Sequence, residues 1–222
     1  MKRAVAFLSL FMCLVVIACC VVSIVYPWYI VSFKKIGSDD KIRNLYYWDE
    51  IRSTDEKLNA TNIINTSSDS GAEKYDDLGY DHIKNVFIVS LAFLCLATLL
   101  SLISAIVILI AFLAKNRICA KVAGVFMVIV MILLLVSLFQ FFRINGAFRS
   151  DDPMCNGNPV ASWISSLFVG DADDTYCHKF MGSNDDEIVK LSYSPYVGFW
   201  LVIGGIFFSL FVFIPLFKTS NH

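Results

Sequence analysis

Four long apolar runs, at 4–26, 86–113, 122–142 and 196–217, constrain the fold of this chain more than any other feature of its sequence. Each run is long enough to cross the hydrocarbon core of a bilayer as a helix, which takes about 20 residues. None of the four contains Asp, Glu, Lys, Arg or His. Only 17% of the chain is charged, whereas soluble domains have about 25%. We therefore predict a membrane protein with four transmembrane helices.

The charged residues are divided unequally between the segments that join these runs. Segments 27–85 and 143–194 hold all 19 acidic residues of the chain, together with 12 basic ones. The N-terminus, the link 114–121 and the C-terminus hold six basic residues and no acidic residue. Positive charge in short segments marks the cytosolic side of a membrane. We therefore expect both termini and the link in the cytosol, and the two long loops outside the cell or in a lumen.

The predicted organisation has eight consecutive segments. They are the cytosolic N-terminus with the first transmembrane helix (1–26), the first extracellular or lumenal loop (27–85), the second transmembrane helix (86–113), the cytosolic link (114–121), the third transmembrane helix (122–142), the second extracellular or lumenal loop (143–194), the fourth transmembrane helix (195–217) and the cytosolic tail (218–222). The basic N-terminus followed by an apolar run also resembles a signal peptide, which would be cleaved. The run is longer than a usual signal peptide core and lacks an Ala-x-Ala site, so we expect helix one to be retained.

Sequons and cysteines are consistent with this orientation. Asn59 and Asn65 each begin an Asn-x-Ser/Thr sequon in the first loop, and we expect both to be glycosylated. Of the seven cysteines, only Cys155 and Cys177 lie in a long loop. An isolated pair of cysteines in an oxidising compartment predicts a disulfide. The predicted fold class is therefore membrane all-α, a four-transmembrane-helix bundle with a small extracellular β/α cap stapled by one disulfide.

The first loop opens with a predicted pair of strands. Pro27 should end the first helix, because it lacks an amide hydrogen and restricts the residue before it. Residues 29–33 are β-branched and aromatic, so they predict a strand that pairs with 43–48. Alternation places Tyr29, Val31 and Phe33 on one face, which we expect to be the buried one. Residues 53–81 are polar and predict an exposed excursion.

The second loop contains one predicted helix. Asn158-Pro159 is a typical helix start, and a single apolar face follows through residue 168. We expect the apolar face of helix 159–168 to pack on the strands of the first loop. The alternative is contact with a partner or the membrane surface through Trp163 and Phe168.

The pattern of aromatic residues in the first loop also resembles that of a known family. Pro27 and Trp28 directly after the first helix, with Leu45 and Trp48 further on, are similar to the start of the claudin and peripheral myelin protein tetraspan superfamily. Members of that family carry a Trp outside the first helix, a Gly-Leu-Trp stretch about twenty residues later and then a cysteine pair. This chain has two tyrosines between Leu45 and Trp48 and no cysteine after Trp48. The resemblance implies four spans and function in the outer loops, where Trp28 and Trp48 are candidate interaction residues.

Motifs for catalysis are missing from the sequence. His82, His178 and His222 all lie outside the apolar runs, which excludes a histidine-box metal site in the bundle. Neither Cys-x-x-Cys nor Gly-x-Ser-x-Gly occurs. The acidic clusters 171–174 and 185–187 lack the ligand spacing of a calcium loop. We therefore expect no catalytic residue, no cofactor and no metal ion.

The function predicted from the sequence is non-catalytic. We expect a multi-pass protein of the plasma membrane or an endomembrane that acts through its loops in adhesion, membrane organisation or fusion, or as an accessory subunit of a larger complex. Its expected partners are the lipid bilayer and other membrane proteins, a second copy among them, and not nucleic acid. A small channel or transporter is the alternative, although transport usually needs intramembrane charges and the strongest polar group in any run is Gln140.

Overall fold

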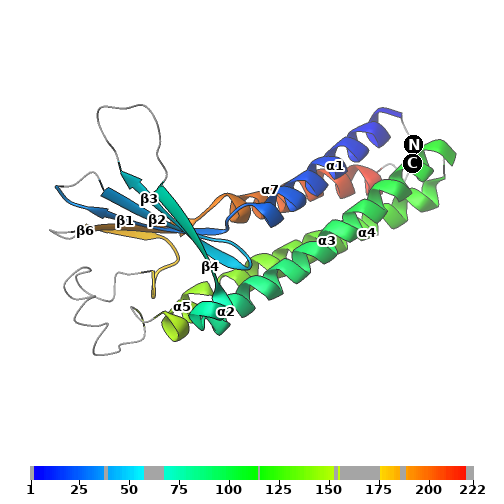
Figure 1. The fold of residues 1–222 in the computed structure, drawn as a ribbon. Helices are drawn as coiled ribbons and strands as arrows, with labels where there is room; N and C mark the ends of the chain where they lie inside the picture. The colour runs from blue at the N-terminus through cyan, green and yellow to red at the C-terminus, as the bar shows by residue number, and fades with distance from the viewer. Residues whose placement is uncertain are drawn as a thin grey trace. The chain divides into compact units, whose positions relative to one another are not determined.

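The computed structural model describes residues 3–37, 40–57, 68–114, 116–152, 155, 176–185 and 189–218. Its elements, in chain order, are α1 (Arg3–Val25), β1 (Tyr29–Lys35), β2 (Asp40–Tyr46), β3 (Glu50–Lys57), β4 (Ser68–Lys74), α2 (Tyr75–Leu78), α3 (Asp81–Ala114), α4 (Arg117–Phe141), α5 (Ile144–Asp151), β5 (Gly182–Asp185), β6 (Val189–Pro195) and α7 (Val197–Lys218) (Figure 1). The fold is mostly helical, with four long apolar helices that could span a membrane, an antiparallel sheet and one disulfide.

The chain divides into two compact units. The helical unit consists of Met1–Tyr26, Val89–Phe139 and Gly198–His222, and the loop unit consists of Pro27–Ile88 and Gln140–Val197. Helix α3 contributes to both, since its 34 residues are about 51 Å long at 1.5 Å per residue. A bilayer core is only about 30 Å thick. The predicted second span therefore continues as a helix beyond the length that a membrane requires.

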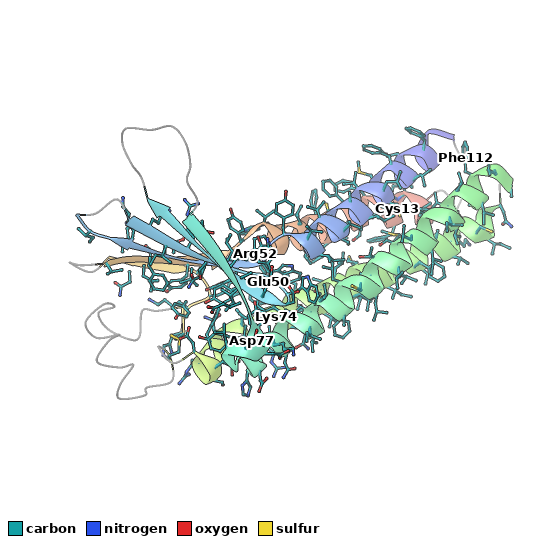
Figure 2. The ribbon with its side chains drawn as sticks, in the orientation of Figure 1. Cys13, Glu50, Arg52, Lys74, Asp77 and Phe112 are labelled. Atoms are coloured by element: carbon teal, nitrogen blue, oxygen red, sulfur yellow. A yellow bond between two sulfur atoms is a disulfide. The ribbon has the colours of Figure 1, made fainter. Side chains whose placement is uncertain are left out.

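Polar groups on small side chains connect the helices of the helical unit. The hydroxyl of Ser23 donates to the carbonyl of Gly198 at 2.7 Å, and that of Ser137 donates to the carbonyl of Ser90 at 2.8 Å. The Cys13 thiol lies 3.4 Å from the carbonyl oxygen of Ser101, and Figure 2 shows Cys13 among the helices. In a medium without water, such hydrogen bonds and small side chains let helices approach closely.

Apolar side chains cover the exposed surface of the helical unit. Phe7, Leu99 and Leu113, for example, are each more than half exposed. A water-soluble protein rarely exposes continuous apolar patches of this kind. Helix α1 begins and α7 ends at the same end of the unit, where α3 also meets α4 (Figure 1). The basic segments of the sequence therefore gather at one end of the bundle.

Two predicted helix limits differ from the structure, for one physical reason. Helix α3 begins at Asp81 rather than at 86, and α4 begins at Arg117 rather than at 122. The link predicted at 114–121 is correspondingly shorter. Hydropathy marks the stretch that fits in lipid, whereas charged residues at either end continue the same backbone hydrogen bonding.

The loop unit contains a six-stranded sheet in the order β4-β3-β2-β1-β6-β5. Every pairing is antiparallel. The predicted strand at 29–33 is confirmed, and its partner is confirmed in part: β1 pairs with β2, with Tyr29 opposite Tyr46, but β2 ends at Tyr46, so residues 47 and 48 of the predicted 43–48 lie beyond it. Gly37, with a φ of 81°, lies in the turn between them, where a left-handed residue is required.

The excursion predicted at 53–81 is exposed at most of the residues whose side chains the structure describes there, but these residues form strands and a short helix. Strand β3 extends to Lys57, and β4 and α2 occupy Ser68–Lys74 and Tyr75–Leu78. The sequence Ser68-Asp-Ser-Gly of β4 has low strand propensity, but backbone pairing with β3 provides the hydrogen bonds. The second loop likewise contributes α5, β5 and β6, which its composition does not predict.

Candidate functional site

The sheet of the loop unit is built jointly by both long loops. Strand β1 from the first loop pairs with β6 from the second, from Tyr29 opposite Pro195 to Lys35 opposite Val189. The amide of Tyr196 also donates to the carbonyl of Trp28 at 2.8 Å. The two loops thus form a single folded body and present one continuous surface.

One face of the sheet is closed by an aromatic core on helix α5. Tyr29 and Val31 are 0% and 1% exposed, whereas Phe33 is half-buried, so the face predicted to be buried is confirmed for its first two residues. The ring of Phe148 on α5 lies 5.5 Å from that of Tyr29, 5.2 Å from that of Tyr46 and 5.2 Å from that of Tyr176. Aromatic pairs at such separations prefer tilted geometry and add to burial. Helix 159–168, the predicted cover of this face, lies outside the described residues.

A second aromatic group joins the start of β1 to the ends of the long helices. The Trp28 ring lies 5.1 Å from that of Phe141, and Phe87 lies 5.5 Å from the same ring. Trp28 is only 3% exposed. This position places Trp28 inside the loop unit, so its predicted role as a contact residue for a partner does not fit its burial.

Two neighbouring aspartates bind the end of α5 to other parts of the loop unit. Asp151 accepts hydrogen bonds from the amide of Ile83, at 2.8 Å, and lies 2.6 Å from Nδ1 of His82. The phenol of Tyr176 donates to buried Asp152 at 2.7 Å. A buried carboxylate needs such donors, because an unpaired charge away from water is costly. These contacts fix the start of α3 against the residues that precede the disulfide.

The phenols around these carboxylates have altered acidity. Burial is the largest cause of the raised pKa of Tyr46 and of Tyr176, and the charge of Asp152 adds to it in both cases. Burial, followed by the nearby carboxylates, raises the pKa of Tyr80 to about 12. All of these shifts favour the neutral phenol. The cluster therefore stabilises the fold at neutral pH and does not supply an activated base.

The predicted disulfide is present between Cys155 and Cys177, whose Cα atoms are 5.6 Å apart. It closes a segment next to Tyr176, which is buried against Phe148. The bond therefore links Cys155, which follows α5, to Cys177, which is next to the buried Tyr176.

Charged side chains lie at the β3–β4 end of the sheet, as Figure 2 shows for Glu50, Arg52, Lys74 and Asp77. The guanidinium of Arg52 pairs with Glu50 and lies 4.6 Å from the centre of the Tyr47 ring. In the part of the chain that is described, no group of three or more His, Cys, Asp or Glu side chains is placed to hold a metal ion.

The remaining predicted site residues divide into two classes. Trp48 is 39% exposed and remains available to a partner. Trp163, Phe168 and the two sequon residues Asn59 and Asn65 lie outside the described residues. The outward face of the sheet, which carries several lysines and arginines, is a feature that the sequence prediction missed. Its signal was the alternation of Ile30, Ser32 and Lys34 with the buried residues of β1.

Comparison with known proteins assigns no family to this chain. No family model matches the chain, and a search of curated proteins finds no significant match.

Proposed function

We propose that this chain is a non-catalytic membrane protein that works through the loop unit in adhesion, membrane organisation or fusion, or as an accessory subunit of a larger membrane complex. One observation carries the proposal: both long loops are folded into a single six-stranded sheet, with strands from each loop side by side. A disulfide and an aromatic core hold this sheet together. Loops that serve only as connections do not need such a framework, whereas a rigid scaffold suits a binding surface.

Exposed residues of the loop unit provide the direct test. Trp48 is the candidate contact residue, because large aromatic side chains dominate binding energy at interfaces. Cells that express the chain should aggregate or bind a partner membrane more than control cells do, and Trp48→Ala should reduce that effect. Met181→Ala is the matched control, since Met181 is exposed to 53% and lies elsewhere in the loop unit. Equal behaviour of expressing and control cells would contradict the proposal.

We place the loop unit outside the cytosol, in the plasma membrane or an endomembrane, with both termini in the cytosol. The support is the distribution of charge, with basic and no acidic residues in the short segments. A protease added to intact cells or to sealed vesicles of known orientation should cut the loop unit and spare the α3–α4 link. Cutting of that link, with protection of residues 53–57 and 68–81, would contradict the proposed orientation and indicate the reverse one. Glycan on Asn59 or Asn65 gives an independent measurement.

We also propose membership of the claudin and peripheral myelin protein tetraspan superfamily. Four apolar helices support it, as does a strand that begins directly after Pro27 and Trp28. The missing Gly-Leu-Trp stretch and the missing first-loop cysteine pair are departures from that family. A sequence of intermediate similarity that carries both features would test this relationship.

A small channel or transporter is the second candidate function. Buried serines on α3 and α4, such as Ser101, Ser104 and Ser137, are the polar groups within the helical unit that favour it. Hydrogen bonds to helix carbonyls already engage Ser104 and Ser137. Purified protein in planar bilayers should therefore show no conductance above that of protein-free bilayers. Reproducible single-channel steps would favour the channel.

A further inference from the structure

The outward face of the sheet gathers basic residues in a unit that is otherwise acidic. The two loops carry 19 acidic and 12 basic residues. Strand register places six of the basic ones on the face opposite the aromatic core, and only three acidic residues occupy the same face. We name these six positions the basic face; they are Lys34, Lys41, Arg43, Arg52, Lys74 and Lys190.

The centre of the basic face is a row of three lysines. Lys34 on β1 lies opposite Lys41 on β2 and, on its other side, opposite Lys190 on β6. Lys34 and Lys190 are exposed, and Lys41 is half-buried. Neighbouring strands are about 4.8 Å apart, and like charges directly opposite one another destabilise a sheet. The placement of Lys34 between two like charges does not stabilise the sheet, which indicates a use outside the fold.

Acidic residues balance the row only at its two ends. Glu56 follows Lys41 in the register, and Asp185 follows Lys190. Glu50 forms an ion pair with Arg52 further along the sheet. Arg43 and Lys190 also interact within the protein, so a polyanion would have to share these two cations with their present partners.

Hydroxyl groups form the row beside the lysines. Ser32 lies opposite Ser192 on β6, and Ser192 lies opposite Ser183 on β5. On the other side, Ser32 lies opposite Arg43, which lies opposite Thr54 on β3. None of the described outward positions on strands β1, β2, β3 and β6 is aromatic. Protein interfaces usually have aromatic anchors at their centre, so a lattice of cations and hydroxyls fits a different kind of partner.

We propose that the basic face binds an extended, sulfated or carboxylated polysaccharide. Its three central lysines are about 5 Å apart across the strands, and Arg43 follows Lys41 about 7 Å along β2, so one linear polyanion can meet several cations at once. In the adjacent row, the hydroxyls of Ser183, Ser192 and Thr54, which are less buried than that of Ser32, can donate to and accept from sugar hydroxyls. In cells this binding rests on the proposed function, because such polymers are met on the non-cytosolic side.

Purified full-length protein in neutral detergent tests the site directly, with immobilised heparin as the probe. The face triple, Lys34→Gln, Lys41→Gln and Lys190→Gln, removes the central row. Wild-type protein should bind heparin and be released by salt, because exposed charges are screened. The face triple should bind about tenfold more weakly or worse. Wild-type protein that does not bind heparin at low salt overturns the proposal.

A matched triple separates this site from bulk charge. Arg143→Gln, Arg149→Gln and Lys179→Gln remove the same charge from exposed positions off the sheet, before α5, on α5 and before β5. The matched triple should bind within about twofold of wild type, because distant exposed charges contribute little. Replacing the three face lysines by arginine should preserve binding. If the two Gln triples lose heparin binding equally, heparin is attracted only by the net charge of the protein, and the proposed site is overturned.

Two further measurements identify the partner and keep the proposed function separate. Vesicles with anionic phospholipid that bind more tightly than heparin, and that lose binding in the face triple, would make the partner a membrane and overturn a polysaccharide. The heparin measurement does not depend on orientation in the cell. If the purified protein binds heparin but removal of cell-surface glycans leaves adhesion unchanged, the site stands and its place in adhesion fails. If adhesion persists without any heparin binding, the proposed function stands and the site fails.

Discussion

Alternate residues of strand β1 point to the two faces of the sheet, one packed on the core and one outward. Single positions show how the two faces differ. Val31 lies opposite Asn44 and Tyr193 and is 1% exposed. Ser32, its neighbour on the outward face, is also only 6% exposed. Its hydroxyl is short, and it lies between two paired strands opposite the longer side chain of Arg43. Ser32 therefore has low exposure because longer side chains cover it, whereas Val31 has low exposure because it is packed in the core.

A charge on the buried face should prevent folding of the loop unit. Val31→Asp places a carboxylate at a position that is only 1% exposed, and burial of a charge away from water costs several kcal/mol. We expect loss of surface delivery and rapid proteolysis of the loop unit. Lys34→Asp, three residues along the same strand but exposed, is the control and should be delivered normally. Normal delivery of Val31→Asp would show that this face of β1 is not in the core.

At the scale of elements, α5 and the disulfide together stabilise the loop unit, in place of a larger hydrophobic core. Helix α5 has only 8 residues, but it supplies Phe148 against Tyr29 of β1 and Asp151 against the start of α3. Asp152, directly after α5, accepts from Tyr176. Helix α7, in the helical unit, depends on small residues for close packing. An added Cβ at Gly205 would lie 3.4 Å from Leu134 and 3.9 Å from Cys19.

Removal of the disulfide should destabilise the loop unit and leave the helical unit folded. For Cys155→Ala or Cys177→Ala we expect a loss of about 2–5 kcal/mol in the free energy of unfolding, the range typical of native disulfides in small secreted domains. Limited proteolysis should then cut β5 and β6 at lower protease concentration, while fragments of α3 and α4 stay intact. Cys95→Ser, at an exposed free cysteine, should change neither. Two free thiols at 155 and 177 in protein purified without reductant would contradict this prediction.

A large side chain at Gly205 should disrupt the packing of α7. Gly205→Leu has no room beside Leu134, and overpacking of a tight contact typically costs about 1–3 kcal/mol. Gly204→Ala is the comparison, since its added Cβ would lie 4.0 Å from the Cys19 sulfur, an ordinary contact distance. Thermal unfolding in detergent should fall for the leucine variant and stay near wild type for the alanine variant. Equal melting temperatures would remove Gly205 from the packed face.

At the scale of the whole molecule, each of the two units is stabilised by interactions that suit its own environment. The helical unit exposes apolar side chains and uses buried serines, which suits lipid. The loop unit buries tyrosines beside carboxylates and carries its basic residues outward. Its stability should therefore depend on pH in a way that the stability of the helical unit does not.

We expect the loop unit to unfold first at alkaline pH. The folded state raises the pKa of Tyr46 and Tyr176, and that of Tyr80 from 10.0 to about 12. Since the folded state retains these protons more strongly than the unfolded state, their contribution is complete below pH 10 and is lost as the pH rises through the window from 10 to 12. Tyrosinate absorbance should increase together with protease sensitivity of the loop unit, with helix content retained. Ionisation near pH 10 without unfolding would contradict the burial of these phenols.

The sequence by itself determined the four helices, the strand after Pro27 and the disulfide pair. Each depends on a local signal or on composition: apolar length, the missing amide of proline, and two cysteines in one loop. Only the tertiary structure decided that β6 from the second loop completes the sheet of the first, that Trp28 is buried, and that Ser68–Lys74 is a strand. These features depend on backbone pairing and packing between residues far apart in the chain, which leave no periodic mark in either segment alone. The basic face arises in the same way, since Lys34, Lys41 and Lys190 become neighbours only when three strands align.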